Sequence, residues 1–325
     1  MQAKPGITII GAGNLANALV LALRRAGYRI EEIVARSRGP SLKKAQKLAK
    51  KIGALATTVS SANLHSQVVW FCVPDAEIAD AAQALAGKIS WIKKIAFHSS
   101  GALASDQLES LRRRGAAVAS VHPMMTFVRG MSSESSSGAS FGRTGLMTST
   151  FKPPFNNGMQ GDRLRNRSLL GVSFAIEGDR TAVRIARRIV RDLGGQSYSI
   201  RKADKAAYHA WGTFASPLLT ALLVTAERVA GLAGVSRKSA RKRMLPILQQ
   251  TLANYAHFKA HEAFSGPIIR GDVDTIKQHL QVLRAEPAAR DVYLALARVA
   301  LQYLPAKNKS QLKDLLKSTK PKSGR

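Results

Sequence analysis

The feature that most constrains the fold of this chain is a glycine-rich turn near its start. Residues 6–27, "GITIIGAGNLANALVLALRRAG", contain a short apolar run, then Gly11 and Gly13, then an amphipathic segment. Such a strand–turn–helix unit, with Ala16 as its third small residue, places a dinucleotide pyrophosphate on the free N–H groups of the helix. We therefore predict a dinucleotide-binding unit. The predicted pyrophosphate contacts are Gly11, Gly13, Asn14 and Leu15.

The residues after the second predicted strand favour one nicotinamide dinucleotide over the other. An NAD site normally has an Asp or Glu at this strand end, where the carboxylate binds the ribose 2′-hydroxyl. Here Arg36, Ser37 and Arg38 follow the strand. The nearest carboxylates, Glu31 and Glu32, come too early in the strand to serve. Because arginine can hold a phosphate through two parallel hydrogen bonds, the sequence favours NADP over NAD. The alternative is a pair of solvated loop arginines.

Up to about residue 200, short apolar runs alternate with amphipathic stretches, and from about residue 203 the pattern is helical only. We therefore predict an α/β fold: a Rossmann-type, mostly parallel sheet with helices on both faces, followed by an all-α C-terminal domain. Pro217 should bend the first long helix of that domain. The predicted strands are 7–10, 32–35, a weaker one at 55–59, 68–73, 94–98, 117–122, 172–177 and 196–200.

Domain boundaries follow from these changes in pattern. Residues 1–200 are predicted to form the dinucleotide-binding domain, and residues 201–318 a helical domain for substrate binding and dimerisation. The stretch 131–167 is rich in Ser, Gly, Asn and Pro, a composition that favours a flexible insertion, with an ordered lid as the alternative. Residues 319–325 are predicted to be a disordered basic tail. The helical domain is apolar on several faces, so we expect a homodimer through it.

The composition limits the other classes of protein to be considered. The formal net charge is +30, yet the basic residues are spread along the chain, without interleaved aromatics or a helix-turn-helix or zinc-finger spacing. We interpret the charge as a solvated basic surface and keep a nucleic-acid-associated protein as the third hypothesis. It would require a continuous basic stripe rather than scattered charge. No apolar run approaches the roughly 20 residues of a membrane span, so we expect a cytoplasmic protein without a membrane partner.

Seven stretches together resemble one group of proteins. In chain order they are "GAGNLANAL", "FCVPDAEIADAA", "FHSSGALASDQL", "SVHPMMTF", "GVSFAIEGD", "DKAAYHAWGTFAS" and "GPIIRGDVDTIKQHL". The chain resembles the bacterial Rossmann-like proteins with an uncharacterised all-helical C-terminal domain. These are related to pyrroline-5-carboxylate reductase, to deazaflavin-dependent NADP oxidoreductases and, more remotely, to β-hydroxyacid dehydrogenases. The resemblance implies a Rossmann domain followed by a helical bundle, and it leaves the substrate unassigned.

Polar residues end three predicted strands at the edge where a cofactor lies in such sheets. By resemblance, the residues from Val73 to Asp75 follow the cofactor ribose, and those from His98 to Gly101 line the reaction centre. The alternative for His98, and for His122 on the next strand, is a hydrogen-bonded histidine that closes a strand. The predicted cofactor contacts here are Val73, Pro74 and Ser99.

The first long helix of the helical domain supplies further candidates. Lys205 and His209 are four residues apart and share one helix face, next to Tyr208. Reduction of a carbonyl or imine requires a proton, which a desolvated Lys or a His can give. The β-hydroxyacid dehydrogenases carry Lys and Asn at this spacing, so the resemblance implies Lys205 as proton donor. The alternative is an exposed Lys and a packed His. The predicted catalytic residues are Lys205, His209 and His98.

The function that follows is an NADP-dependent oxidoreductase acting on a small carbonyl or imine substrate. The alternative is a non-catalytic NADP-binding sensor, which would share the cofactor residues and differ at Lys205 and His209. His257 and His261 have a helical metal-ligand spacing, but no third ligand is evident, so no metal site is predicted.

Overall fold

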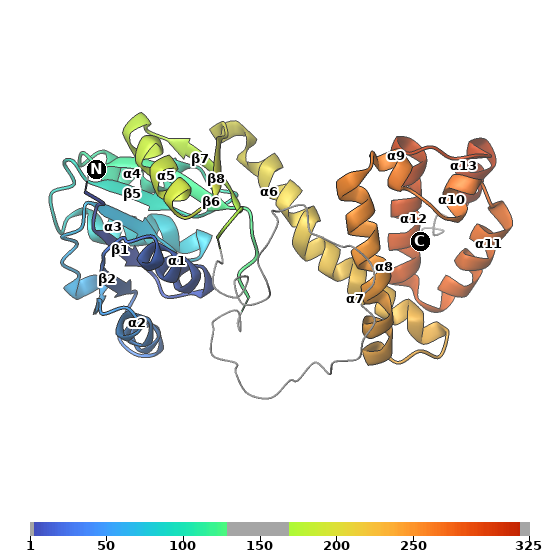
Figure 1. The fold of residues 1–325 in the computed structure, drawn as a ribbon, viewed down its shortest axis with the longest axis horizontal. Coiled ribbons are helices and arrows are strands. Elements are labelled where there is room, and N and C mark those ends of the chain that lie inside the picture. Colours follow the sequence, from blue (N-terminus) through green and yellow to red (C-terminus); the bar gives the residue numbers. More distant parts are fainter. Residues whose placement is uncertain (1–2, 129–168, 319–325) are drawn as a thin grey trace, which may run out of the picture. The chain divides into compact units, whose positions relative to one another are not determined.

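The computed structural model describes residues 3–128 and 169–318, which divide into two compact units (Figure 1). Within the described residues, the first unit extends to Thr213 and the second begins at Phe214. Helix α6 (Lys205–Thr213) therefore belongs to the first unit, although the predicted boundary preceded it. The helix packs against the sheet, because its Lys205 and Tyr208 side chains are buried and bond to residues of β6. The predicted insertion at 131–167 and tail at 319–325 lie outside the described residues.

An eight-stranded sheet forms the centre of the first unit. Its order is β3-β2-β1-β4-β5-β6-β7-β8, and neighbouring strands are parallel except for β6 and β7. The prediction of a mostly parallel Rossmann-type sheet is confirmed. Several central strands are fully buried, which explains why they read as continuous apolar runs. The strands are β1 (Ile7–Ile10), β2 (Ile30–Ala35), β3 (Leu55–Thr58), β4 (Val68–Phe71), β5 (Ile95–His98), β6 (Ala117–Pro123), β7 (Ser173–Gly178) and β8 (Gln196–Ser199).

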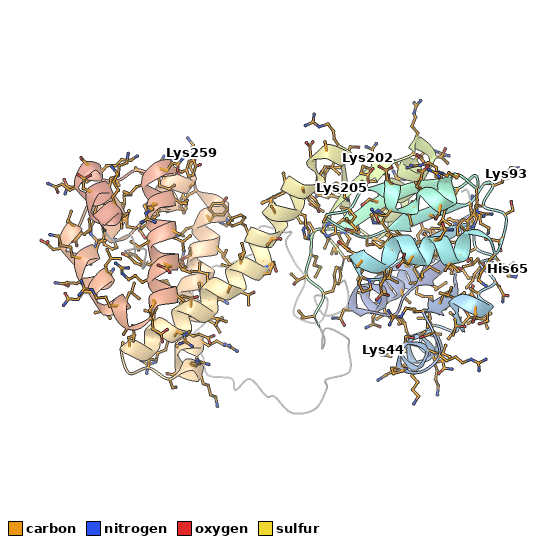
Figure 2. All side chains as sticks on the ribbon, turned by 180° about the vertical axis from the view of Figure 1, so that it is seen from behind. Lys44, His65, Lys93, Lys202, Lys205 and Lys259 are labelled. Atoms are coloured by element: carbon orange, nitrogen blue, oxygen red, sulfur yellow. The ribbon has the colours of Figure 1, made fainter. Side chains whose placement is uncertain are left out.

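Helices cover both faces of this sheet (Figures 1 and 2). One hydrophobic cluster unites the sheet with α1 (Asn14–Arg25), α2 (Pro40–Lys50) and α5 (Arg180–Asp192). A second cluster, on the other face, includes α3 (Ile78–Ala86) and α4 (Glu109–Arg112). The sheet thus separates two helical layers, as is usual for doubly wound folds.

The second unit is helical. Its core is formed by residues of α11, α12 and α13, with Leu312 and Ile276 at its centre. Pro217 lies in a π-helical turn, Phe214–Leu218, that precedes α7. The helices are α7 (Leu219–Leu232), α8 (Arg237–His257), α9 (Ala260–Ala263), α10 (Pro267–Arg270), α11 (Val273–Val282), α12 (Pro287–Tyr303) and α13 (Lys309–Ser318).

One helical stretch, Lys202–Leu232, is long and apolar enough to cross a membrane by length and composition alone. It contains no uninterrupted apolar run of that length, because small and polar residues are interspersed along it. Only 6% of its most apolar window is buried. A single stretch of this kind is weak evidence for a membrane span, since soluble helices pass the same test.

Candidate active site

The turn between β1 and α1 has the geometry of an anion site. Gly11 has a φ of 105°, and a Cβ atom there would lie 2.6 Å from the Cys72 carbonyl oxygen. Only glycine fits this position. At Gly13, by contrast, a Cβ atom would meet nothing within 4 Å, so this side of the turn is open. No side chain caps the start of α1, and its first turn has no acidic residue. Its N–H groups are therefore available to a phosphate.

The neighbouring positions fit the same ligand. Ala16, the third small residue of the turn, is fully buried against the sheet, which lets the helix approach the strand closely. The Asn14 side chain donates to the Phe127 carbonyl oxygen at 3.0 Å and so fixes the first residue of the helix. The Val73 side chain lies against Gly11, and Pro74 is exposed beside it. The predicted pyrophosphate and ribose contacts thus lie at one edge of the sheet.

The end of β2 exposes the residues that we expect at the ribose. Arg36, Ser37 and Arg38 are all exposed. The Arg36 guanidinium forms an ion pair with Glu77 at 2.8 Å. Glu32, by contrast, is buried and accepts hydrogen bonds from the Thr57 hydroxyl and from backbone N–H groups. Within the described residues, no carboxylate stands at the end of this strand, which suits a 2′-phosphate better than a free 2′-hydroxyl.

His98, predicted to be catalytic, is held inside the protein. Its side chain is fully buried. The Ser100 N–H donates to His98 Nδ1 at 3.2 Å, and His98 Nε2 lies 3.0 Å from the Ala104 carbonyl oxygen, to which it donates. Burial lowers the pKa of His98 to about 4, so the ring is neutral at pH 7. Both ring nitrogens have protein partners. His98 therefore closes the turn after β5, which is the alternative role given above for this histidine. Neither of its ring nitrogens is free to contact a substrate.

The hydroxyls of Ser99 and Ser100 fix the turn after β5 through four further hydrogen bonds. Ser100 donates from its hydroxyl to Asp75 at 2.6 Å, and this hydroxyl also accepts from the backbone N–H groups of Ala102 and Leu103. The Ser99 hydroxyl accepts from the Trp70 indole N–H at 2.8 Å. The hydroxyl of Ser99, a predicted cofactor contact, thus already has a partner in the protein. Together these bonds join the ends of β4 and β5.

Lys205 links the turn after β5 to the middle of β6. Its side chain is only 1% exposed, and its ammonium group donates to the Ser100 carbonyl oxygen at 3.0 Å and to the Ser120 hydroxyl at 2.6 Å. Burial lowers its pKa to about 8, while the carboxylates of Glu177 and Asp75 act in the opposite direction. Lys205 therefore places a positive charge beneath the site instead of presenting it at the surface, where the predicted proton donor would have to be.

Above Lys205, His122 and Tyr208 form a hydrogen-bonded pair. His122 Nδ1 lies 2.7 Å from the Tyr208 hydroxyl, and the two rings meet edge to face. Burial lowers the pKa of His122 to about 4, helped by the charge of Lys205, and burial raises that of Tyr208. Both groups are thus neutral at pH 7. When the hydroxyl donates to Nδ1, the ring proton is on Nε2.

The surface next to His122 includes Gly101 and His209. A Cβ atom at Gly101 would lie 2.9 Å from both His122 Nε2 and His209 Cδ2. The two imidazoles therefore meet at this glycine, and His209 is exposed. Only a residue without a side chain lets both rings approach. Of the predicted catalytic residues, His209 is the one that the structure leaves accessible.

From the sequence, His122 was a candidate but was not among the predicted catalytic residues. Tyr208 was noted only as a neighbour of Lys205 and His209. The pair is separated by 86 residues in the chain, so no local spacing connects its members. The available signal was the polar strand end "SVHP". Asp75 was predicted to lie beside the cofactor, whereas Ser120 was visible only as the first residue of this motif.

His257 and His261 have a metal-ligand spacing in the sequence, but no metal site was predicted there. Helix α8 ends at His257, Phe258 is extended, and His261 belongs to α9. The two histidines therefore do not share a helix face. Across residues 3–128 and 169–318, no group of three or more potential ligands is close enough to hold a metal ion.

Two family models match the chain. A Rossmann-like domain matches residues 1–123, and a domain of unknown function, DUF2520, matches residues 172–300. The chain combines a Rossmann-like domain with a DUF2520 domain. The resemblance found in the sequence is confirmed, and the DUF2520 match begins within the sheet, before the helical unit. No curated protein sequence matches the chain.

Solved structures share this two-part fold at low sequence identity. A Bacteroides fragilis protein assigned as an NADP oxidoreductase is 21% identical, with 91% of this chain and 97% of that one covered and a TM-score of 0.67. A reductive aminase from Aspergillus terreus, in complex with NADPH and ethyl-5-oxohexanoate, is 14% identical, with coverage of 96% and 100% and a TM-score of 0.61. A pyrroline-5-carboxylate reductase from Coxiella burnetii is 16% identical, with coverage of 96% and 99% and a TM-score of 0.52. At these sequence identities, the similarity to the solved structures establishes the fold of this chain and nothing about its substrate.

Proposed function

We propose that this chain is an NADP-dependent oxidoreductase that transfers a hydride between NADP(H) and a small carbonyl or imine compound. The observation that carries the proposal is the neutral His122–Tyr208 pair, placed over the buried cation of Lys205. The pair lies at the same edge of the sheet as the open glycine turn. Structural neighbours that bind NADPH or reduce imines support this reading.

The chain's own residues would hold the cofactor at three places. The pyrophosphate would lie on the N–H groups of Asn14 and Leu15, past Gly11 and Gly13. Arg36 and Arg38 would hold the 2′-phosphate, with Ser37 between them. Val73, Pro74 and the Ser99 backbone would border the ribose and nicotinamide. When bound, NADPH supplies the hydride from its nicotinamide ring.

His122 is then the group that meets the developing charge. As hydride reaches the substrate carbon, negative charge grows on the carbonyl oxygen or imine nitrogen, and the Nε2–H of His122 donates a hydrogen bond to that atom. The proton that completes the alcohol or amine is taken from solvent water. The lowered pKa of His122 keeps its ring neutral at pH 7. A neutral imidazole still has one N–H group, which can donate a hydrogen bond to the developing negative charge. Tyr208 holds the ring tautomer, and the ammonium of Lys205 lies close enough to stabilise the same charge.

The pH profile tests the role of Lys205. Its charge is present below its pKa of about 8 and is lost as the pH rises through that value, so kcat should fall by up to about tenfold per pH unit above about 8. Unfolding does not explain such a fall. The native pKa is below that of the unfolded chain, so the burial penalty of this group is relieved from about pH 8 to 10.5 and stability rises.

The variant Lys205→Met should lack this alkaline limb and have a lower kcat at pH 7, with folding checked by circular dichroism. Loss of the ammonium leaves the Ser100 carbonyl oxygen and the Ser120 hydroxyl with one donor fewer but also removes the burial penalty of the charge. The two effects oppose each other, so we expect the free energy of unfolding to change by less than about 3 kcal/mol. A wild-type profile that stays flat to pH 9.5 would exclude the charge of Lys205 from the reaction.

The function itself is tested by screening purified protein for NADPH oxidation against keto acids, cyclic imines and an oxidised deazaflavin. Turnover with a keto acid or imine supports the proposal. Turnover with the deazaflavin alone would make a second cofactor the electron partner. Tight NADPH binding without turnover on any class would instead favour the NADP-sensing alternative.

We further propose that the protein is a homodimer through its helical unit. Large apolar side chains are exposed on α7, α8 and α12, and exposed apolar surface of this kind is typical of protein interfaces. Light scattering at micromolar concentration should report twice the 35.0 kDa of one chain. The variant Ile247→Asp/Leu252→Asp, at two exposed positions of α8, should shift the mass toward one chain. The exposed apolar residues of these helices are Leu219, Val224, Leu232, Leu245, Ile247, Leu252, Tyr255, Leu296, Val299 and Tyr303.

A further inference from the structure

Cations are concentrated on the helices that cover one face of the sheet. Helices α1, α2 and α5 share one hydrophobic cluster and therefore form one layer (Figure 1). Together they carry eleven Lys and Arg residues against one carboxylate, Asp192. On the opposite layer, α3 and α4 carry one Arg and two carboxylates. Charge that is scattered along the sequence is thus brought to one layer by the fold.

Helix α5 carries the densest part of this layer. Arg180, Arg184, Arg187 and Arg191 recur at intervals of four, three and four residues, so they lie along one side of the helix. We call these four residues the arginine stripe. At a rise of 1.5 Å per residue, the stripe extends over roughly 16 Å. Its members line a shallow, open hollow on the surface.

The arginine stripe is not neutralised by the carboxylates at the ends of α5. Asp179, just before the helix, accepts from Arg112 and from the Val118 N–H. Asp192, at its last residue, accepts from the Tyr28 hydroxyl. Arg187 of the stripe donates to a serine hydroxyl. No member of the arginine stripe forms an ion pair with any residue described by the structure, and Arg180, Arg184 and Arg191 also lack a side-chain hydrogen bond there.

We propose that this layer binds the phosphate backbone of double-stranded nucleic acid, without reading base sequence. Guanidinium groups hold phosphate oxygens through paired N–H donors, and a row of such cations gains further from counterion release. A single strand would need aromatic platforms for stacking, and α1, α2 and α5 contain no aromatic residue. The surface requires neither the glycine turn nor His122, so it is independent of the proposed reductase activity.

An anionic membrane fits this surface less well. Peripheral helices that bind membranes insert large apolar side chains between the lipid headgroups. On α1, α2 and α5 the large apolar residues are buried or partly buried in the cluster that they share with the sheet. The exposed side of the layer therefore offers charge without apolar anchors, which matches a phosphodiester backbone.

The test is fluorescence anisotropy with a labelled DNA duplex of arbitrary sequence, titrated with the full chain at several salt concentrations. The test variant replaces all four residues of the arginine stripe by Gln. The matched control removes four exposed cations from α8 in the helical unit: Arg237→Gln, Lys238→Gln, Lys242→Gln and Arg243→Gln. Both variants thus have the same net charge. Circular dichroism checks that each is folded.

The unaltered chain should bind the duplex with an affinity that falls steeply as salt rises. The stripe variant should bind roughly 30-fold more weakly, and its slope of log K against log salt should be shallower by about 2 to 4. The α8 control should lose no more than about threefold. Should the fourfold variant fail to fold, Arg180→Gln/Arg184→Gln removes two exposed members and should cost roughly fivefold.

Three results would overturn the proposal. Equal losses in the stripe variant and the α8 control would mean that only net charge matters. Absence of duplex binding at low salt would exclude the interaction altogether. Sedimentation with phosphatidylserine vesicles, dependent on the stripe and unaffected by excess duplex, would make the surface a membrane contact.

Discussion

Replacing His122 by phenylalanine should lower kcat by roughly a hundredfold or more, the usual scale for a lost proton donor or oxyanion-type hydrogen bond. The phenyl ring retains the edge-to-face contact with Tyr208 and removes only the ring nitrogens. The protein should therefore fold, and its affinity for NADPH should change little. The measurement is kcat for the substrate found in the NADPH oxidation screen, together with a fluorescence titration of NADPH.

His65→Phe is the matched control, since His65 is exposed and precedes β4 at the opposite edge of the sheet (Figure 2). It should leave kcat within about twofold of the unaltered protein. A His122→Phe variant with unchanged kcat would show that His122 only closes its strand. The role of donor would then pass to His209, the other accessible imidazole beside Gly101.

Removing the arginines after β2 should abolish the preference for NADPH. The double variant Arg36→Gln/Arg38→Gln should weaken NADPH binding by about 2–4 kcal/mol, or roughly 30- to 700-fold, if each guanidinium makes a charge-assisted pair with the 2′-phosphate. NADH has no phosphate at this position, so its binding should change little. Isothermal titration calorimetry with both cofactors measures the difference.

The two arginines should not contribute equally. The Arg36 guanidinium forms an ion pair with Glu77 and must give up that partner to bind the phosphate. Arg38 is exposed and has no such partner among the described residues. The single Arg38→Gln variant should therefore cost more than Arg36→Gln. Arg113→Gln/Arg114→Gln removes the same charge beyond α4 and serves as control. Equal affinity of the unaltered protein for NADPH and NADH would refute the assignment.

Features encoded over a few neighbouring residues could be predicted from the sequence. The glycine turn is one, because a positive φ at Gly11 and an open side at Gly13 depend on residues within a single strand–turn–helix unit. The alternation of strands and helices is another, because burial on both faces makes β1, β4 and β5 uniformly apolar. Parallel pairing then follows from the crossover helices.

The site at the strand ends depends on contacts between residues far apart in the chain, and no local sequence spacing predicts such contacts. Lys205 and Ser120 are 85 residues apart, and the direction of the lysine side chain is decided by packing against the sheet. Helical periodicity placed Lys205 and His209 on one face correctly, yet it could not show that the ammonium would be buried and the imidazole exposed. His98 looked equivalent to His122 in sequence, and only the turn after β5 distinguishes them.

The charge distribution shows the same limit on a larger scale. Arginines of α5 and lysines of α2 are more than a hundred residues apart in the chain, so the sequence shows them as scattered. Topology places both helices on one face of the sheet, and a basic layer results. The criterion of a continuous basic stripe could therefore be applied only once the fold was known.

The most direct measurement of the central claim follows a deuterium label carried at the transferable position of the NADPH nicotinamide. Product formed from a keto acid or cyclic imine is analysed by mass spectrometry and by the position of the label. The account predicts one deuterium on the former carbonyl or imine carbon, because the hydride moves directly from cofactor to substrate. Unlabelled product, or NADPH binding with no product from any carbonyl or imine tested, would contradict it.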